Sequence, residues 1–392
     1  MYIAVKGGQA AIAASHQLLE QQRRGPTDIA AMSVAQIEHQ LGLLVARVMA
    51  EAGVYDRQLA ALSIKQACGD AIEAVFLLRA YRTTLPRFGT AAALDTQAMR
   101  VQRRVSSIFK DMPGGQVLGP TFDYTQRLLD FDLLDQESAV SAREQLDLTT
   151  NSGAAPIGSE PTTPIGSEAN VAAPSNPEPS DAAPDALAAL IAEGLIEAAH
   201  GSPGDPEPDD ITVEPPHFPV ARTTRMQMMA RGDEGWLLGM GYSTQRGYAF
   251  THPFAGEIRV GKAAVSISPP ELGFEIGIGE VELTECQMIN QFVGSADVAP
   301  TFTRGYALVL GHNERKAMAI SLLDRAQRHE EFDENMTAPA QDAEFALGHA
   351  DSVEASGFVQ HLKLPHYVTF ESELELLRQL RADQSAPETG DE

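Results

Sequence analysis

Residues 257–285, with the sequence EIRVGKAAVSISPPELGFEIGIGEVELTE, carry the clearest structural signal in the chain. Apolar and polar residues alternate there in four short runs, at 257–260, 264–268, 273–278 and 280–285. Alternation with a period of two is typical of strands that bury one face. Glycine and proline residues separate the runs, and residues 302–310 form a further run of the same kind. We therefore predict a small antiparallel sheet in this half of the chain.

Helical patterns surround the predicted sheet. Apolar residues spaced three and four apart predict helices on both sides of it, at 9–23, 34–51, 56–82, 97–110, 222–230, 314–329 and 371–382. Ser33 and Gln36 form a capping-box pattern, Gly69 is expected to interrupt the third helix, and Asn313 is expected to cap the sixth. Residues 231–236 are predicted to be a turn.

The composition changes sharply between these two parts. Residues 135–216 contain sixteen acidic residues and a single basic one, and thirteen prolines fall between positions 156 and 219. Such a segment cannot bury enough apolar surface to fold, so we expect an acidic disordered linker. A short amphipathic helix at 185–198 is expected to be solvated.

The predicted fold class is therefore α+β, with four regions. An N-terminal helical domain covers residues 1–134, and the acidic Pro-rich linker covers 135–217. A C-terminal mixed α/β domain with a small antiparallel sheet covers 218–383, and a disordered tail covers 384–392.

Composition limits the classes of function. The chain has 392 residues, 43% of them hydrophobic, and a formal net charge of −25, which argues against general binding to nucleic acid or anionic membranes. The two cysteines indicate no disulfide framework, and Cys286 is expected in the core. The sequence lacks a signal-peptide pattern and a run of about 20 apolar residues, so we expect a soluble, cytoplasmic protein.

Residues 79–127 depart from the overall acidity, with eight basic residues against three aspartates. One interpretation is an anion site, because guanidinium groups match phosphate oxygens two at a time. The alternative is a basic helix face, formed by residues 97–110, that turns to water or to an acidic partner. A loop rich in glycine and proline follows at 111–124, and its amides could hold a phosphate.

Residues 357–367, GFVQHLKLPHY, contain two histidines, His361 and His366, with Pro365 between them. Proline prevents a continuous helix through both, so a bend at 364–365 is what could bring the two imidazoles together. Converging imidazoles suit zinc, whereas the alternative is two exposed polar residues on a loop. Nearby residues could supply further ligands: Asp342, Glu344, His349, Asp351 and Glu354.

No Walker, dinucleotide, kinase, G-x-S-x-G or H-E-x-x-H pattern is present, so motifs of these kinds name no reaction. Several longer stretches do resemble a known family, the PhnI subunit of the carbon–phosphorus lyase core complex. They are residues 5–8, 64–67, 76–87, 109–124, 230–235, 241–248, 284–288, 302–306 and 357–367. The resemblance covers residues 1–134 and 218–383 and lapses in the linker.

The resemblance implies a role in bacterial phosphonate breakdown. With partner subunits, such a chain displaces adenine from C1′ of Mg-ATP and attaches a phosphonate, which gives a ribose 1-phosphonate 5-triphosphate. In isolation it is a purine nucleosidase, because water takes the place of the phosphonate. The expected partners are the radical lyase subunit, the small core subunits and ATP-binding-cassette-type subunits, with two copies of this chain in the complex.

The resemblance also implies site residues. His361 and His366 match the family's paired histidines, which bind zinc where this subunit meets the radical lyase subunit. Displacement at an anomeric carbon needs an acid and a nearby carboxylate, for which the candidates are Asp123 and Glu285. Anionic substrates need cationic side chains, and the candidates are Arg79, Arg82, Arg87, Arg104, Arg246 and Arg304. The alternative function is a scaffold whose zinc histidines complete the active site of the lyase partner.

Overall fold

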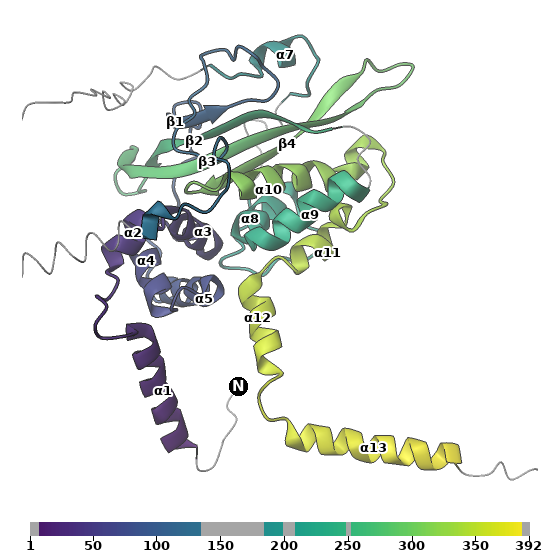
Figure 1. The fold of residues 1–392 in the computed structure, drawn as a ribbon. Helices are drawn as coiled ribbons and strands as arrows, with labels where there is room; N and C mark the ends of the chain where they lie inside the picture. Colours follow the sequence, from purple (N-terminus) through teal and green to yellow (C-terminus); the bar gives the residue numbers. More distant parts are fainter. Residues whose placement is uncertain (1–7, 135–183, 199–207, 248–251, 386–392) are drawn as a thin grey trace, which may run out of the picture. The chain divides into compact units, whose positions relative to one another are not determined.

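The computed structural model describes residues 8–134, 184–198, 208–247 and 252–385 (Figure 1). A four-stranded antiparallel sheet with surrounding helices confirms the predicted α+β class. The chain divides into two compact units, residues 1–117 with 181–392, and residues 118–180. Within the second unit, residues 118–134 are mostly turns and irregular chain. No described helix is long and apolar enough to cross a membrane.

The sheet has the strand order β1-β2-β3-β4, and each strand pairs antiparallel with its neighbour. The strands are β1 (Arg100–Val105), β2 (Phe254–Ile267), β3 (Ile276–Val293) and β4 (Thr301–Leu310). The runs predicted between 257 and 285 merge into the two long strands β2 and β3, because the glycines inside them do not break the pairing. The β2–β3 register shifts at Gly256 and opposite Gly277 and Gly279, but pairing continues past each shift.

The helix predicted over residues 97–110 is wrong, because this segment contains strand β1 and pairs with β2. Val101 and Val105 are β-branched and suit a strand. Arg103 and Arg104 are both buried on opposite faces of the sheet, where Arg103 pairs with Glu314 and Arg104 with Glu257. The arginines of this strand therefore do not form a basic face turned to water.

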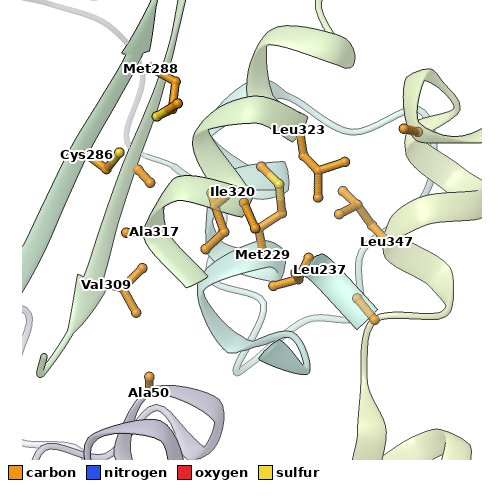
Figure 2. Packing of buried hydrophobic residues seen from close by; sticks show 14 of the residues in the cluster. Ala50, Met229, Leu237, Cys286, Met288, Val309, Ala317, Ile320, Leu323 and Leu347 are labelled. Carbon is orange, nitrogen blue, oxygen red and sulfur yellow. The ribbon is translucent and has the colours of Figure 1, made fainter. Parts of the chain in front are cut away.

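The largest core lies between the sheet and helix α10 (Glu314–Ala326). Figure 2 shows Cys286 and Val309 of the sheet facing Ala317 and Ile320 of this helix. Cys286 is fully buried, as predicted, and burial raises the pKa of its thiol. Helices α8 (Arg222–Arg231), α9 (Glu234–Gly247) and α11 (Ala343–Gly348) pack against the far side of α10 or beside it. The core thus fixes α10 as the centre of this unit.

Four N-terminal helices form a second core. They are α2 (Val34–Gln40), α3 (Gly42–Ala52), α4 (Arg57–Gln66) and α5 (Ala71–Arg82). Helix α1 (Gln9–Arg24) precedes them and contains no buried residue. The Ser33–Gln36 capping box is confirmed, and so is the interruption near Gly69, whose φ is +88°. The single helix predicted over 34–51 is in fact two, with a break at Leu41.

Three other predictions near the C-terminal helices change. Residues 234–236 begin helix α9 rather than ending a turn, because Asp233 accepts from the backbone amide of Trp236 at 2.7 Å. Asn313 precedes α10 but gives no side-chain cap. Its amide instead donates to the carbonyls of Ala46 and Leu310, at 3.1 and 2.6 Å. The remaining elements are η1 (His329–Phe332), η2 (Pro339–Gln341), α12 (Ser352–His361) and α13 (Tyr367–Ser385).

Residues 184–198 are docked on the sheet, so the prediction of a solvated helix there is wrong. Helix α7 (Ala188–Ala192) is short, and Leu187 and Ile196 are buried against Ile289 of β3. Ile196 forms a parallel bridge with Phe302 on the open edge of β4. The Glu197 carboxylate accepts from both terminal nitrogens of Arg328, each at 3.0 Å. Residues 135–183 and 199–207 lie outside the described residues.

A cluster of charges is buried where α3, α9 and α10 meet. Lys316 is fully buried, and Glu51 is 1% exposed. Within the described part of the chain, neither Lys316 Nζ nor Glu51 Oε2 has a hydrogen-bond partner. Burial lowers the pKa of Lys316 to about 8, although the carboxylates of Glu51 and Glu234 act in the opposite direction. The charged form of Lys316 therefore destabilises the folded chain.

We expect Gly305→Ala to destabilise the chain by roughly 3 kcal/mol or more, because a new methyl group cannot fit between β4 and α10. A Cβ at this position would lie 1.6 Å from the carbonyl oxygen of Ser321. The matched control is Gly239→Ala in helix α9, where a Cβ has no neighbour within 4 Å. Denaturant unfolding of the full chain should show a large loss of unfolding free energy for Gly305→Ala only. An equal loss in Gly239→Ala would contradict this packing.

We expect Lys316→Met to stabilise the chain at pH 7 by on the order of 1–3 kcal/mol. The folded-state pKa is about 8 and the ordinary value is 10.5, so the unfolded state binds the proton more tightly. The free-energy cost of burying the charged Lys316 side chain is therefore fully present below pH 8, and it disappears as the pH rises to 10.5. Unfolding measured at pH 7 and pH 10 should show a gain that shrinks with pH, and a constant gain would refute the assignment.

Candidate functional site

The two histidines of the 357–367 stretch lie side by side. Helix α12 ends at His361 and α13 begins at Tyr367, so the bend that Pro365 predicts is present between them. The Nε2 atoms of His361 and His366 are 2.8 Å apart, and the two ring planes meet at 87°. The predicted convergence of the imidazoles is therefore confirmed.

The hydrogen bonds of the pair determine which nitrogen is available. His366 Nδ1 contacts the backbone carbonyl of Leu364, and because a carbonyl only accepts, Nδ1 carries the proton. Nε2 of His366 then presents a lone pair towards His361, which is the form that binds metals.

The pair fits half of a zinc site. Two nitrogens on one tetrahedral zinc lie roughly 3.3 Å apart, given Zn–N distances of about 2.0–2.1 Å. An opening of about 0.5 Å between the rings would reach this separation. Within the described residues, however, no group of three or more His, Cys, Asp or Glu side chains converges. Asp342 and Asp351, two of the residues considered as further ligands, instead cap helices α11 and α12.

Exposed apolar side chains surround the histidine pair in sequence. Phe358, Leu362, Tyr367 and Val368 are 63–79% exposed. Neither α12 nor α13 contains a buried residue. Several large apolar residues uncovered together are typical of an interaction surface, so this segment is suited to contact another molecule.

Glu285 lies on β3 and is only 4% exposed. Its Oε1 accepts from the hydroxyls of Thr96 and Tyr306, both at 2.9 Å, and its Oε2 accepts from Arg259 Nε at 3.0 Å. Burial and this carboxylate raise the pKa of the Tyr306 hydroxyl. All of these contacts are those of a satisfied buried ion pair, which would have to open before the carboxylate could meet a substrate.

Asp123 has the opposite environment. It lies in the exposed turn of residues 121–125, and its backbone amide donates to Thr121 Oγ1 at 3.1 Å. Asp123 belongs to the second compact unit and Glu285 to the first. The two candidate carboxylates therefore belong to different units, and their catalytic roles stay predictions.

Four of the six candidate arginines are engaged within the chain. Arg79 binds Asp351 through Nη1 at 2.6 and 2.8 Å, and Arg87 pairs with Asp210. Thr212 and Arg87 together hold the pKa of Asp210 at about 2. The other two engaged arginines lie on the sheet: Arg104 binds Glu257, and Arg304 donates to the Gln287 amide oxygen. Burial lowers the pKa of Arg304.

Arg82 and Arg246 differ from the other four. In the part of the chain that the structure describes, neither makes an ion pair. Arg82 is half-buried on α5, and Arg246 is exposed on α9 with its guanidinium 5.9 Å from the centre of the Tyr242 ring. These two are the arginine candidates whose charge is open to an anion.

The sequence pattern does not indicate which residue neutralises Glu285. Arg259 is 1% exposed on β2, and the alternation of Glu257 and Arg259 with Ile258 and Val260 was the available signal. Two charged residues at alternating positions of a strand predict a polar face. They do not show that other segments cover that face and bury the charges. Lys316 also carries no sequence signal beyond its place in an amphipathic helix.

Comparison with known proteins identifies the family. The family model for PhnI, described as a bacterial phosphonate metabolism protein, matches residues 1–384. A protein of Rhizobium meliloti (strain 1021), named alpha-D-ribose 1-methylphosphonate 5-triphosphate synthase subunit PhnI, is 52% identical over 390 residues, 100% of this chain and 97% of the relative. The protein of the same name from Escherichia coli (strain K12) is 52% identical over 385 residues, 98% of this chain and 99% of the relative. The chain therefore belongs to the PhnI family of bacterial phosphonate metabolism proteins.

Proposed function

We propose that this chain is the PhnI subunit of a ribose 1-methylphosphonate 5-triphosphate synthase. The observation that carries the proposal is 52% identity, over almost the whole length of both chains, to two proteins that bear this name. Identity of that extent preserves a fold. The half-buried histidine pair is consistent with it, and so are Arg82 and Arg246, which make no ion pair among the residues that the structure describes.

In the proposed reaction, the chain and its partner subunits act on Mg-ATP and a phosphonate. A phosphonate oxygen forms a bond to C1′ of the ribose, the C1′–N9 bond breaks, and adenine leaves with a proton. Without the partners, water takes the place of the phosphonate and the chain acts as a purine nucleosidase. The transition state has oxocarbenium character, so a carboxylate near C1′ and an acid near the base would both lower the barrier.

Among the candidate carboxylates, Asp123 is the better choice for a catalytic group. It is exposed, whereas Glu285 is buried with Arg259. Among the arginines, Arg82 and Arg246 are the better choices for the triphosphate, because the others already bind carboxylates or carbonyl oxygens of the chain.

We propose that His361 and His366 hold zinc together with ligands from the radical lyase subunit. The half-filled ligand set and the exposed apolar residues beside it support a site shared between chains. Zinc in such a place fixes the geometry of the interface and can polarise a substrate oxygen. We further propose that two copies act with the small core subunits and ATP-binding-cassette-type subunits in the cytoplasm.

A second candidate function is a scaffold for the lyase partner. The observation that favours it is that the histidine pair is only half-buried, whereas Glu285 is buried, and that exposed apolar side chains flank the pair in sequence. In that case the histidines serve bond cleavage in the partner and have no role in base release.

We expect the purified chain, incubated with ATP or GTP, to release the free purine base. Asp123→Asn should lower the rate by about 10²-fold or more, the usual contribution of an acid–base group, with no change in the unfolding midpoint. Asp132→Asn is the matched control, because Asp132 is also exposed in the same unit. Chromatography of released base measures the rate. No release, either alone or with partner subunits, would reject the synthase proposal.

We expect His361→Ala and His366→Ala each to remove zinc from the assembled complex, since one imidazole cannot hold the ion with the remaining ligands. His39→Ala, an exposed histidine on α2, is the control. Metal analysis of the purified complex gives the zinc content. Under the scaffold function both variants abolish phosphonate cleavage and leave base release intact. Loss of both steps in a complex that still assembles would contradict the scaffold function.

A further inference from the structure

A hollow of about 390 Å³ lies where α12 meets α5 and α9. Its wall includes Trp236 from α9 and Ile72 from α5. Ser352, Ser356 and Gln360 line it from α12. The volume is in the range of small-molecule sites. Gln360 is the residue before His361, so the same helix that forms this wall also carries the proposed zinc ligand.

The aromatic side of the hollow is held rigidly. Trp236 is half-buried, and its Nε1 donates to the carbonyl of Ala346 at 2.7 Å. The ring of His349, also in the wall, lies 6.0 Å from the indole and 5.0 Å from Phe345. His349 Nδ1 donates to the Phe345 carbonyl at 2.8 Å, which leaves Nε2 as an acceptor in the neutral ring. Two aromatic rings, each held by a hydrogen bond to a backbone carbonyl, therefore line the same space.

The wall formed by α12 carries polar groups suited to the edge of a planar ring. Ser352, Ser356 and Gln360 can donate or accept, and they lie on successive turns of α12. Asp233 contributes a carboxylate that already accepts from Arg47 Nη2 at 2.8 Å. Aromatic rings and hydrogen-bonding groups in one wall are the features that bind flat nitrogen heterocycles, because every such base has a π-face and a polar edge.

We propose that this hollow binds the purine ring of the nucleoside triphosphate, with the base stacked on Trp236 and its polar edge towards Ser356 and Gln360. The assignment rests on the proposed function for the identity of the ligand, but the site itself is independent of the zinc histidines and of Asp123. Purine binding in the hollow can therefore be tested without zinc, and zinc binding can be tested without the purine.

Trp236 provides the measurement, because it is the only tryptophan in the sequence. Adenine or adenosine stacked on the indole should quench the fluorescence of the full chain in a saturable way. Ribose 5-phosphate and tripolyphosphate, which lack the base, should not. We expect Ser356→Phe, which fills the hollow, to weaken adenosine binding at least about tenfold, as the loss of one stacked ring does. Glu354→Phe places the same side chain on α12 outside the wall and should bind normally.

The outcomes separate this inference from the proposed reaction. Saturable quenching that Ser356→Phe abolishes, with or without base release from ATP, supports the hollow as the purine site. Base release with an unchanged KM for ATP in Ser356→Phe would overturn it and leave the synthase proposal standing. Absence of quenching by adenine and adenosine in the wild-type chain, or equal quenching by ribose 5-phosphate, would also overturn it.

Discussion

The structure depends on the close approach of strand β4 to helix α10 at Gly305. Only a glycine lets the Ser321 carbonyl come this near to a strand, and the same contact brings Ala307 and Val309 against the helix. Asp324 on α10 then accepts hydrogen bonds from the backbone amide of Tyr306, at 2.9 Å, and from Nε and Nη2 of Arg222. One helix thereby orders the sheet, helix α8 and the hydroxyl of Tyr306 on the opposite face.

Ion pairs with distant carboxylates explain the local excess of arginines in residues 79–127. Their partners are distant in sequence: Asp351 for Arg79, Asp210 for Arg87, Glu280 for Arg100, and Glu314 and Glu257 for Arg103 and Arg104. The basic stretch is therefore balanced by acidic residues of the C-terminal half. Arg103 and Arg104 are buried in their pairs, and buried pairs add little net stability but penalise any arrangement that leaves one charge alone.

Sequence patterns predicted the elements whose signal is local. Alternation gave the strands around 257–285, Ser33 and Gln36 gave a helix start, and Pro365 gave the bend between His361 and His366. Sequence patterns failed where contacts between distant residues determine the structure. Arg103 and Arg104 suit a helix as well as a strand until β2 is beside them, and Glu197 reads as linker charge until Arg328 is in reach. The hydrogen-bond partners of Glu285 and the residues that line the hollow beside Trp236 come from distant segments of the chain. A short stretch of sequence therefore cannot predict them.

The double role of Asp351 has a consequence for the C-terminal segment. Its carboxylate accepts the amides of Val353 and Glu354 and also binds Arg79 of α5, so the base of α12 is clamped to the N-terminal helices. Beyond that clamp, helices α12 and α13 bury none of their side chains. The histidine pair thus follows the fixed start of α12 and lies between two helices that contain no buried residue. Substitution of Arg79 would therefore change the orientation of α12, and with it the position of His361 and His366, although Arg79 contacts neither histidine.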